Sequence, residues 1–226
     1  FLSSGKFELS ASVGSASIQI EAWGAGGSGN STGNGGSGGG YASYTAVLAN
    51  ATYDVIVGSA VTKANGENSY VTRSLGSIII RAAGGQVDGT VSGQATLQTG
   101  SVTYLGGLGG SNDEGYSAFD GSGGGSSGNS AGNGVAGVNE AGQVINSRLL
   151  SSFYYRNDYI GGAPGTASGA GAGGAGAYYN FNGPLGVQAA GNGSVPGGGG
   201  GGSYDYGTAN YGAGGKGKVV VTGVFA

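Results

Sequence analysis

The 226-residue chain contains no cysteine and no histidine, has only 3 prolines, and is 8% charged. Without cysteine it can form neither a disulfide framework nor a thiolate zinc site. Without histidine it lacks the usual general base, the Ser-His-Asp triad and most zinc chemistry. The chain has 8 Lys+Arg and 11 Asp+Glu, so it lacks the excess of basic residues that nucleic-acid binding requires. No apolar run approaches the roughly 20 residues of a membrane span, so we expect neither nucleic-acid binding nor membrane insertion.

Glycine supplies 58 residues of the chain. Each glycine in ordered structure costs roughly 0.5–1 kcal/mol relative to alanine, so the total, on the order of tens of kcal/mol, exceeds a domain's net stability of about 5–15 kcal/mol. Such a composition is typical of disordered chains. Here, however, charge is sparse and the chain contains 14 tyrosines. We therefore expect the glycines to occupy positions in the fold that no other residue can occupy.

Short β-strand patterns occupy the first third of the chain and its end. In residues 16–23, Ile18, Ile20 and Ala22 alternate with residues that face the other way. The Asn-Gly pair within residues 64–68 is typical of a tight turn. Further strands are expected over 42–48, 52–58, 68–73, 77–83 and 217–226. The last of these is expected to pair with the first ones.

Residues 24–40 have a period of three. Two of the three registers are glycine except at Asn30 and Thr32, and the third carries small side chains such as Ser28 and Ser37. A polyproline-II helix has three residues per turn and no internal hydrogen bonds, so its buried backbone groups must pair with neighbouring helices. Proline is too rare for collagen. The pattern predicts a bundle of polyglycine-II helices; a flexible glycine/serine linker is the alternative.

These patterns together predict an all-β protein with essentially no α-helix. We expect an antiparallel, jelly-roll-like β-sandwich formed by residues 1–105 and 217–226, with the glycine run 24–40 in the bundle. Residues 106–216 are expected to form the polyglycine-II bundle, in which variable loops separate the glycine runs.

Several motifs resemble those of a known group of proteins. A strand ends in W-G-A-G-G, a glycine run leads into a Gly-Tyr-Ala strand, a Y-x-V-x-V-G strand follows, and the chain closes with G-x-V-x-V. This layout is similar to the glycine-rich modules at the tips of phage tail fibres and of bacterial fibre adhesins, over residues 16–85 and 196–226. It also looks like the glycine-rich region of anaplastic lymphoma kinase receptors, but those carry cysteine.

The resemblance implies a receptor-binding adhesin that recognises a cell-surface glycan or an outer-membrane protein. It also implies an extracellular location at the tip of a virion or cell-surface fibre, a fibre shaft N-terminal to this segment, and a homotrimer. A monomer on a trimeric shaft is the alternative. We expect no catalysis, cofactor or metal, because the carboxylates that could serve a glycosidase or a calcium site follow no recognisable spacing.

Aromatic residues gather in the variable segments 111–120, 138–160, 178–188 and 203–211. Tyrosine offers a broad apolar face and a hydroxyl at low entropic cost, which suits recognition loops. Asn and Asp side chains beside such rings can bond sugar hydroxyls. The predicted receptor-binding residues are Tyr154, Tyr155, Asn157, Asp158, Tyr159, Tyr178, Tyr179, Asn180, Phe181, Tyr204, Asp205 and Tyr206. The same rings could instead cap the ends of the bundle.

Two other functions fit a glycine-rich chain. A structural matrix or wall protein is one, although a purely structural chain should show a regular repeat and few aromatic residues in its loops. An ice-binding protein is the other, although it needs a flat face of repeated small residues, and bulky segments interrupt the glycine runs here.

Overall fold

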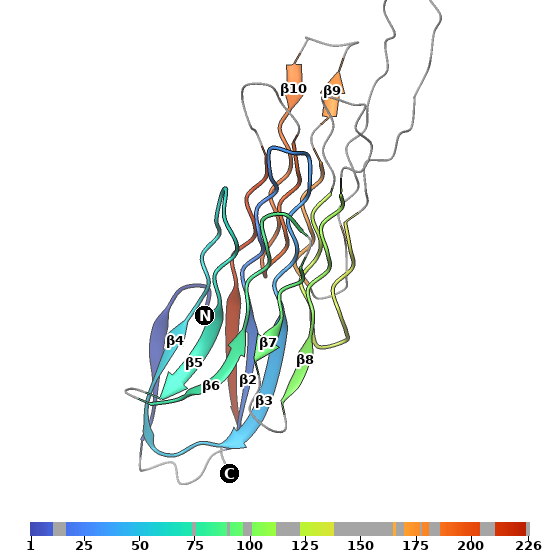
Figure 1. Cartoon of the computed structure of the whole chain (residues 1–226). Helices are drawn as coiled ribbons and strands as arrows, with labels where there is room; N and C mark the ends of the chain where they lie inside the picture. Colours follow the sequence, from blue (N-terminus) through green and yellow to red (C-terminus); the bar gives the residue numbers. More distant parts are fainter. Residues whose placement is uncertain are drawn as a thin grey trace, which may run out of the picture.

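The computed structural model describes residues 1–10, 17–73, 76–89, 91–96, 101–111, 123–137, 165, 170–176, 178–180, 186–203 and 211–224. Within these ranges the regular secondary structure consists of β-strands, and no residue is helical. The strands of two sheets gather at one end of the molecule, and glycine-rich runs extend away from them side by side (Figure 1). The predicted all-β class is therefore confirmed.

Two antiparallel sheets form the sandwich-like end. The first has the order β1-β4-β5-β6-β7, with the bounds Gly5–Leu9, Ala51–Ile56, Ser69–Arg73, Ile78–Ala82 and Ala95–Thr96. The second has the order β11-β2-β3-β8, with the bounds Lys218–Val224, Ser17–Trp23, Tyr41–Val47 and Val102–Tyr104. A separate hairpin joins β9 (Tyr178–Asn180) to β10 (Gly186–Gln188).

The hydrophobic core lies between the two sheets. Ile20 and Val219 from the second sheet pack with Val55, Val71 and Ile80 from the first, all of them buried. The alternation predicted for β2 is confirmed, because its apolar set is buried and the first residue between its members is exposed. The closing strand also lies as predicted, since β11 pairs along the whole of β2.

Beyond the sheets, the inner glycine-rich runs bond to a different neighbour at each successive residue. The run 24–30 illustrates the cycle. The amides of Gly24 and Gly27 donate to the run 34–40, those of Ala25 and Ser28 to the segment 64–67, and those of Gly26 and Gly29 to the run 212–215. A β-strand cannot bond in this way, because its amides point alternately to two sides. The cycle of three gives this inner run hydrogen-bonded neighbours on three sides.

We call this part of the molecule the glycine array. It comprises the described residues of 24–40, 57–68, 83–94, 105–111, 123–137, 165–176, 189–203 and 211–217, which hydrogen-bond to one another through their backbones. A Cβ at Gly27 would come within 3.0 Å of the Gln86 carbonyl, and one at Gly199 would do so at the Gly36 carbonyl. Real Cβ atoms do not approach that closely, so glycine is required there by steric contact with neighbouring backbones.

Two segments of the array contain few consecutive glycines, and the sequence did not predict that they belong to the array. Residues 57–68 and 83–94 leave the first sheet, pass along the glycine runs and return. The bend predicted within 64–68 lies at 62–64 instead, with Lys63 at φ 62°. Gly66 serves packing rather than the turn, because a Cβ there would clash with the Ala25 carbonyl.

The third register of residues 24–40 is also covered. Ser28 and Ser37 are fully buried. The Ser37 hydroxyl donates to the Val91 carbonyl at 2.6 Å and accepts from the Gln86 amide at 2.7 Å. The register that carries side chains is therefore enclosed at these serines as well, because the segments 57–68 and 83–94 cover it.

Runs at the edge of the array keep one register open to solvent. In the run 105–111, Leu105 and Leu108 are 43% and 44% exposed, whereas residues 106 and 107 between them are buried. Lys216 is likewise exposed beside buried neighbours. Side chains are tolerated at these positions because they point away from the packed backbones.

Candidate functional site

The end of the array remote from the sheets carries the hairpin of β9 and β10 (Figure 1). Three predicted receptor-binding residues, Tyr178, Tyr179 and Asn180, form β9 and lie opposite Gln188, Val187 and Gly186. The hairpin thus places this part of the predicted site at the distal end. The other predicted site residues lie outside the described residues: Tyr154, Tyr155, Asn157, Asp158, Tyr159, Phe181, Tyr204, Asp205 and Tyr206.

A row of large side chains crosses the second sheet where it meets the array. Lys218, Trp23, Tyr41 and Tyr104 lie opposite one another on the four neighbouring strands. The Trp23 and Tyr41 ring centroids are 4.9 Å apart, those of Tyr41 and Tyr104 are 6.2 Å apart, and the Lys218 Nζ lies 5.5 Å from the Trp23 ring. We call these four residues the junction row.

The junction row is closed to ligands at its centre. Trp23 is 7% exposed and Tyr41 is 1% exposed. The Tyr41 hydroxyl donates to Glu21 Oε1 at 2.6 Å, and burial together with this bond to Glu21 raises the pKa of Tyr41 well above its usual value. The row therefore fastens the sheet to the array. The sequence contains one signal for the junction row, because each of its four residues directly adjoins a glycine-rich run.

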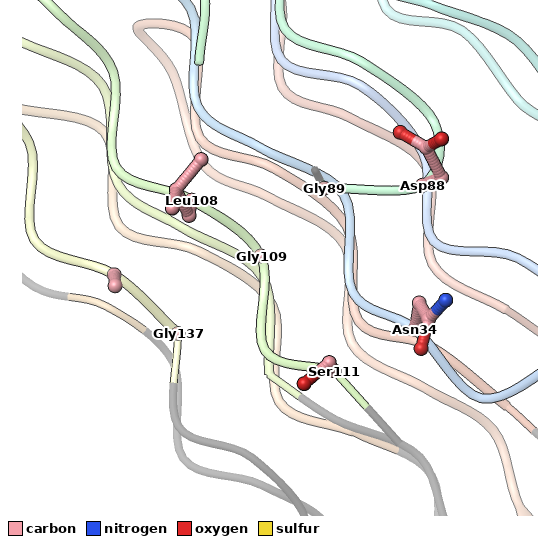
Figure 2. A pocket seen from close by; sticks show the side chains of 8 residues that line it. Asn34, Asp88, Gly89, Leu108, Gly109, Ser111 and Gly137 are labelled. Atoms are coloured by element: carbon pink, nitrogen blue, oxygen red, sulfur yellow. The ribbon is translucent and has the colours of Figure 1, made fainter. Parts of the chain in front are cut away.

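A half-open groove lies on the flank of the array, near the reversal between runs 24–30 and 34–40. Its volume is about 400 Å³, and its lining residues are Asn34, Asp88, Gly89, Leu108, Gly109, Ser111, Ala136 and Gly137. In Figure 2, Asp88 and Asn34 lie on one side of Gly109, and Leu108 and Gly137 lie on the other. The groove could not be predicted from the sequence, because its walls come from four separate segments that only the array brings together.

Two features of the groove connect it to the variable segments. Ser111 is the first residue of the predicted variable segment 111–120, and Gly137 directly precedes the segment 138–160. The groove therefore lies at the base of two of the segments that were expected to bind a receptor.

Within the described ranges there is no group of three or more carboxylate, histidine or cysteine residues that could hold a metal ion. In the same part of the chain, no helix is long and apolar enough to cross a bilayer. The carboxylates considered for a calcium site lie in residues 112–120, which fall outside the described ranges.

A family model described as a glycine-rich domain matches residues 2–223, which span both sheets and the whole array. The chain belongs to this glycine-rich domain family. No curated protein sequence matches it. The glycine-rich domain here thus includes the sandwich-like end as well as the glycine runs, and the two are one matched unit.

Proposed function

We propose that this glycine-rich domain is a receptor-binding adhesin at the tip of a fibre, and that its runs are polyglycine-II helices which hold recognition loops at the distal end. The observation that carries the proposal is the hydrogen-bond cycle of three in the array, together with the distal position of β9 and β10. A three-residue turn is the geometry of polyproline-II-type helices.

A densely hydrogen-bonded array suits recognition because it is stiff. Its inner runs, including 35–40, 123–129 and 197–203, are buried throughout. Loops held by such a support lose less conformational freedom when they bind, which lowers the entropic cost of association. The array has little side-chain chemistry, so we assign specificity to the aromatic segments, of which β9 lies at the distal end.

The domain is proposed to act outside the cell, on a virion or cell-surface fibre, with a fibre shaft on its N-terminal side. Its receptor is a cell-surface glycan or an outer-membrane protein. A homotrimer is the expected assembly, and a monomer seated on a trimeric shaft is the alternative. Light scattering of the purified chain at micromolar concentration distinguishes them, because a stable monomer contradicts the homotrimer.

An ice-binding role fits less well. The exposed positions on the edge of the array include Leu105, Leu108, Val135, Val195 and Lys216, which differ in size and polarity. They do not repeat one small residue over a flat face. A thermal-hysteresis measurement tests this alternative directly, and activity in that assay would replace the adhesin proposal.

Binding of the fluorescently labelled chain to a panel of bacterial strains tests the adhesin proposal. We expect saturable binding to some strains, which periodate treatment abolishes if the receptor is a glycan and protease treatment abolishes if it is a protein. The variants Tyr178→Ala and Tyr179→Ala should lose at least tenfold in affinity, because aromatic anchors contribute about 2 kcal/mol or more to binding.

The melting temperature of each variant is the control. Binding at wild-type strength in both variants would contradict the role of these two rings. Loss of binding together with unfolding would identify them as structural caps. Failure of the wild-type chain to bind any strain in a broad panel would count against the adhesin proposal itself.

A further inference from the structure

We propose that Asn133 and Asn192 are sites of hydrolytic deamidation, and that the folded array keeps both sites closed. Each of them directly precedes a glycine. Asparagine followed by glycine is especially prone to this reaction, because glycine has no side chain to hinder its own backbone nitrogen. The inference goes beyond the adhesin proposal and does not depend on it, since it concerns the chemistry of the array itself.

The reaction joins the glycine nitrogen to the side-chain amide carbon, Cγ, of the preceding asparagine. A carbon–nitrogen bond forms and closes a succinimide ring, the bond from Cγ to the amide nitrogen breaks, and ammonia leaves with the proton of the glycine amide. Water then opens the ring at either of its carbonyl carbons, which gives aspartate or isoaspartate. Nothing is oxidised or reduced, and water is the co-reactant. The glycine amide must therefore be free to release its proton.

In the folded array, both reacting groups of each pair are held by a single residue of another run. At Asn133, the Leu105 amide donates to Oδ1 at 2.9 Å, and the Gly134 amide donates to the Leu105 carbonyl at 2.8 Å. At Asn192, the Ala213 amide donates to Oδ1 at 2.8 Å, and the amide of the following glycine donates to the Ala213 carbonyl at 2.9 Å. We call each of these pairs of bonds an asparagine clamp. Attack requires the two runs to separate, because the clamp engages the proton that must leave and fixes the carbonyl group that must be reached.

Burial does not protect these side chains. Asn133 and Asn192 are both exposed, so water reaches them and can open a succinimide once it has formed. The protection therefore rests on the hydrogen bonds of the clamps and lasts while the runs stay paired. Val135 and Ala136, which follow the first clamp, are exposed as well, so this clamp lies at an edge of the array. Local opening of that edge is the event that permits the reaction.

The two products differ in their effect on the array. The clamp uses the side-chain oxygen of Asn133, and an aspartate carboxylate offers the same acceptor. Isoaspartate instead routes the backbone through Cβ and Cγ, which lengthens the chain by one carbon atom. Gly134 and Gly137 both donate to carbonyls of the run 105–111, and the added atom moves them out of step with these acceptors. Isoaspartate at this position therefore prevents the edge from closing again.

Incubation of the full chain in mildly alkaline buffer, followed by peptide mapping with mass spectrometry, measures the rate at each asparagine. Synthetic peptides covering residues 130–137 and 189–196 provide the unfolded reference under the same conditions. The full chain should react at least about tenfold more slowly than the peptides at both sites, because it reacts only through its open state. Equal rates in the chain and the peptides overturn the proposal, and so do peptides that fail to deamidate.

Leu105→Pro tests the clamp directly, because it removes the amide that donates to Asn133. Leu105 is 43% exposed, and proline suits the backbone of a polyproline-II turn. The variant should raise the rate at Asn133 several-fold and leave that at Asn192 unchanged. Leu108→Pro is the matched control, because Leu108 lies on the same run with nearly the same exposure and its amide makes no hydrogen bond within the described part of the chain. It should react as the wild type does at both sites.

Equal rates at Asn133 in the two proline variants overturn the clamp. If Leu105→Pro unfolds the chain, both sites react at the rates of the peptides, and the comparison of the wild-type chain with the peptides decides alone. Asn133→Asp is the control for the product, and it should melt as the wild type does. The isoaspartate form, separated by chromatography from aged protein, should melt at a lower temperature. An isoaspartate form that melts as the wild type does contradicts the loss of the edge.

Discussion

Adjacent residues of one glycine run are under opposite constraints. Gly107 is buried, and a Cβ there would come within 3.0 Å of the Val135 carbonyl. The next residue, Leu108, carries a large side chain into the solvent. The difference arises because a three-residue turn points successive residues at different neighbours. Position within the cycle of three, rather than membership of the run, decides what a residue can be.

Gly107→Ala should therefore destabilise the protein far more than Leu108→Ala. Overpacking a filled interior typically costs about 1–3 kcal/mol, and here the clash is with backbone that cannot rotate away. Leu108→Ala removes exposed apolar surface and should change the unfolding free energy by less than about 0.5 kcal/mol. Chemical denaturation of both variants measures the difference. Equal effects would contradict the register assignment.

Ser37→Ala should destabilise the protein by about 1–3 kcal/mol, because it removes two hydrogen bonds that the buried Ser37 hydroxyl makes with partly buried backbone groups, each contributing about 0.5–1.5 kcal/mol. The control is Ser31→Ala, an exposed position in the reversal after the run 24–30, for which a change within about 0.5 kcal/mol is expected. Urea unfolding of the two variants provides the test, and an unchanged midpoint for Ser37→Ala would show that water replaces the hydroxyl.

Elements with a local pattern could be predicted from the sequence, and those that depend on distant partners could not. The strand around Ile20 was predicted because its alternation is visible in seven residues. Residues 57–68 have no such period, and their course is set by backbone groups of runs that lie far away in sequence. The groove was missed for the same reason. The aromatic segments were recognised by composition, but most of their residues lie outside the described ranges.

The junction row makes the free energy of unfolding depend on pH in the alkaline range. The pKa of Tyr41 is raised by burial and by its bond to Glu21, so the folded state retains the phenol proton where the unfolded chain loses it, above about pH 10. The free energy of unfolding should therefore fall as the pH rises above that value. Tyr41→Phe removes this contribution.

Denaturant unfolding of the wild type and of Tyr41→Phe at pH 8 and pH 11 measures the effect. Tyr41→Phe should be less stable at pH 8, where the hydrogen bond to Glu21 is lost, and its stability should decline less between the two pH values. Parallel declines would mean that Tyr41 is not the group responsible.

At the scale of the molecule, the first nine residues connect the two sheets. The Phe1 backbone nitrogen donates to the Val219 carbonyl at 2.7 Å, and the Val219 amide donates back to the Phe1 carbonyl at 3.1 Å. The chain then passes Ser4, whose hydroxyl accepts from the Val57 amide, and enters β1 at the edge of the first sheet. This segment therefore covers the edges of β11 and β4.

Deletion of residues 1–9 should lower the melting temperature and promote association, because it exposes two strand edges. Dynamic light scattering and a thermal melt measure both effects. The control is Lys6→Ala, which removes the exposed ion pair with Asp54 and should change the unfolding free energy by less than about 1 kcal/mol. A deletion variant that melts and scatters as the wild type does would show that the edges are protected by other means.

Solvent-facing side chains at the edge of the array, such as those of Leu105, Leu108 and Lys216, limit the number of glycine-rich runs that can pack together. Another run could join only by bringing its backbone against positions where side chains now stand, and those side chains hold it away. A descendant of this chain could therefore gain a further pair of runs only after it had lost the side chains at one edge of the array. These few outward-facing side chains therefore limit the width of the array, although the buried glycines outnumber them.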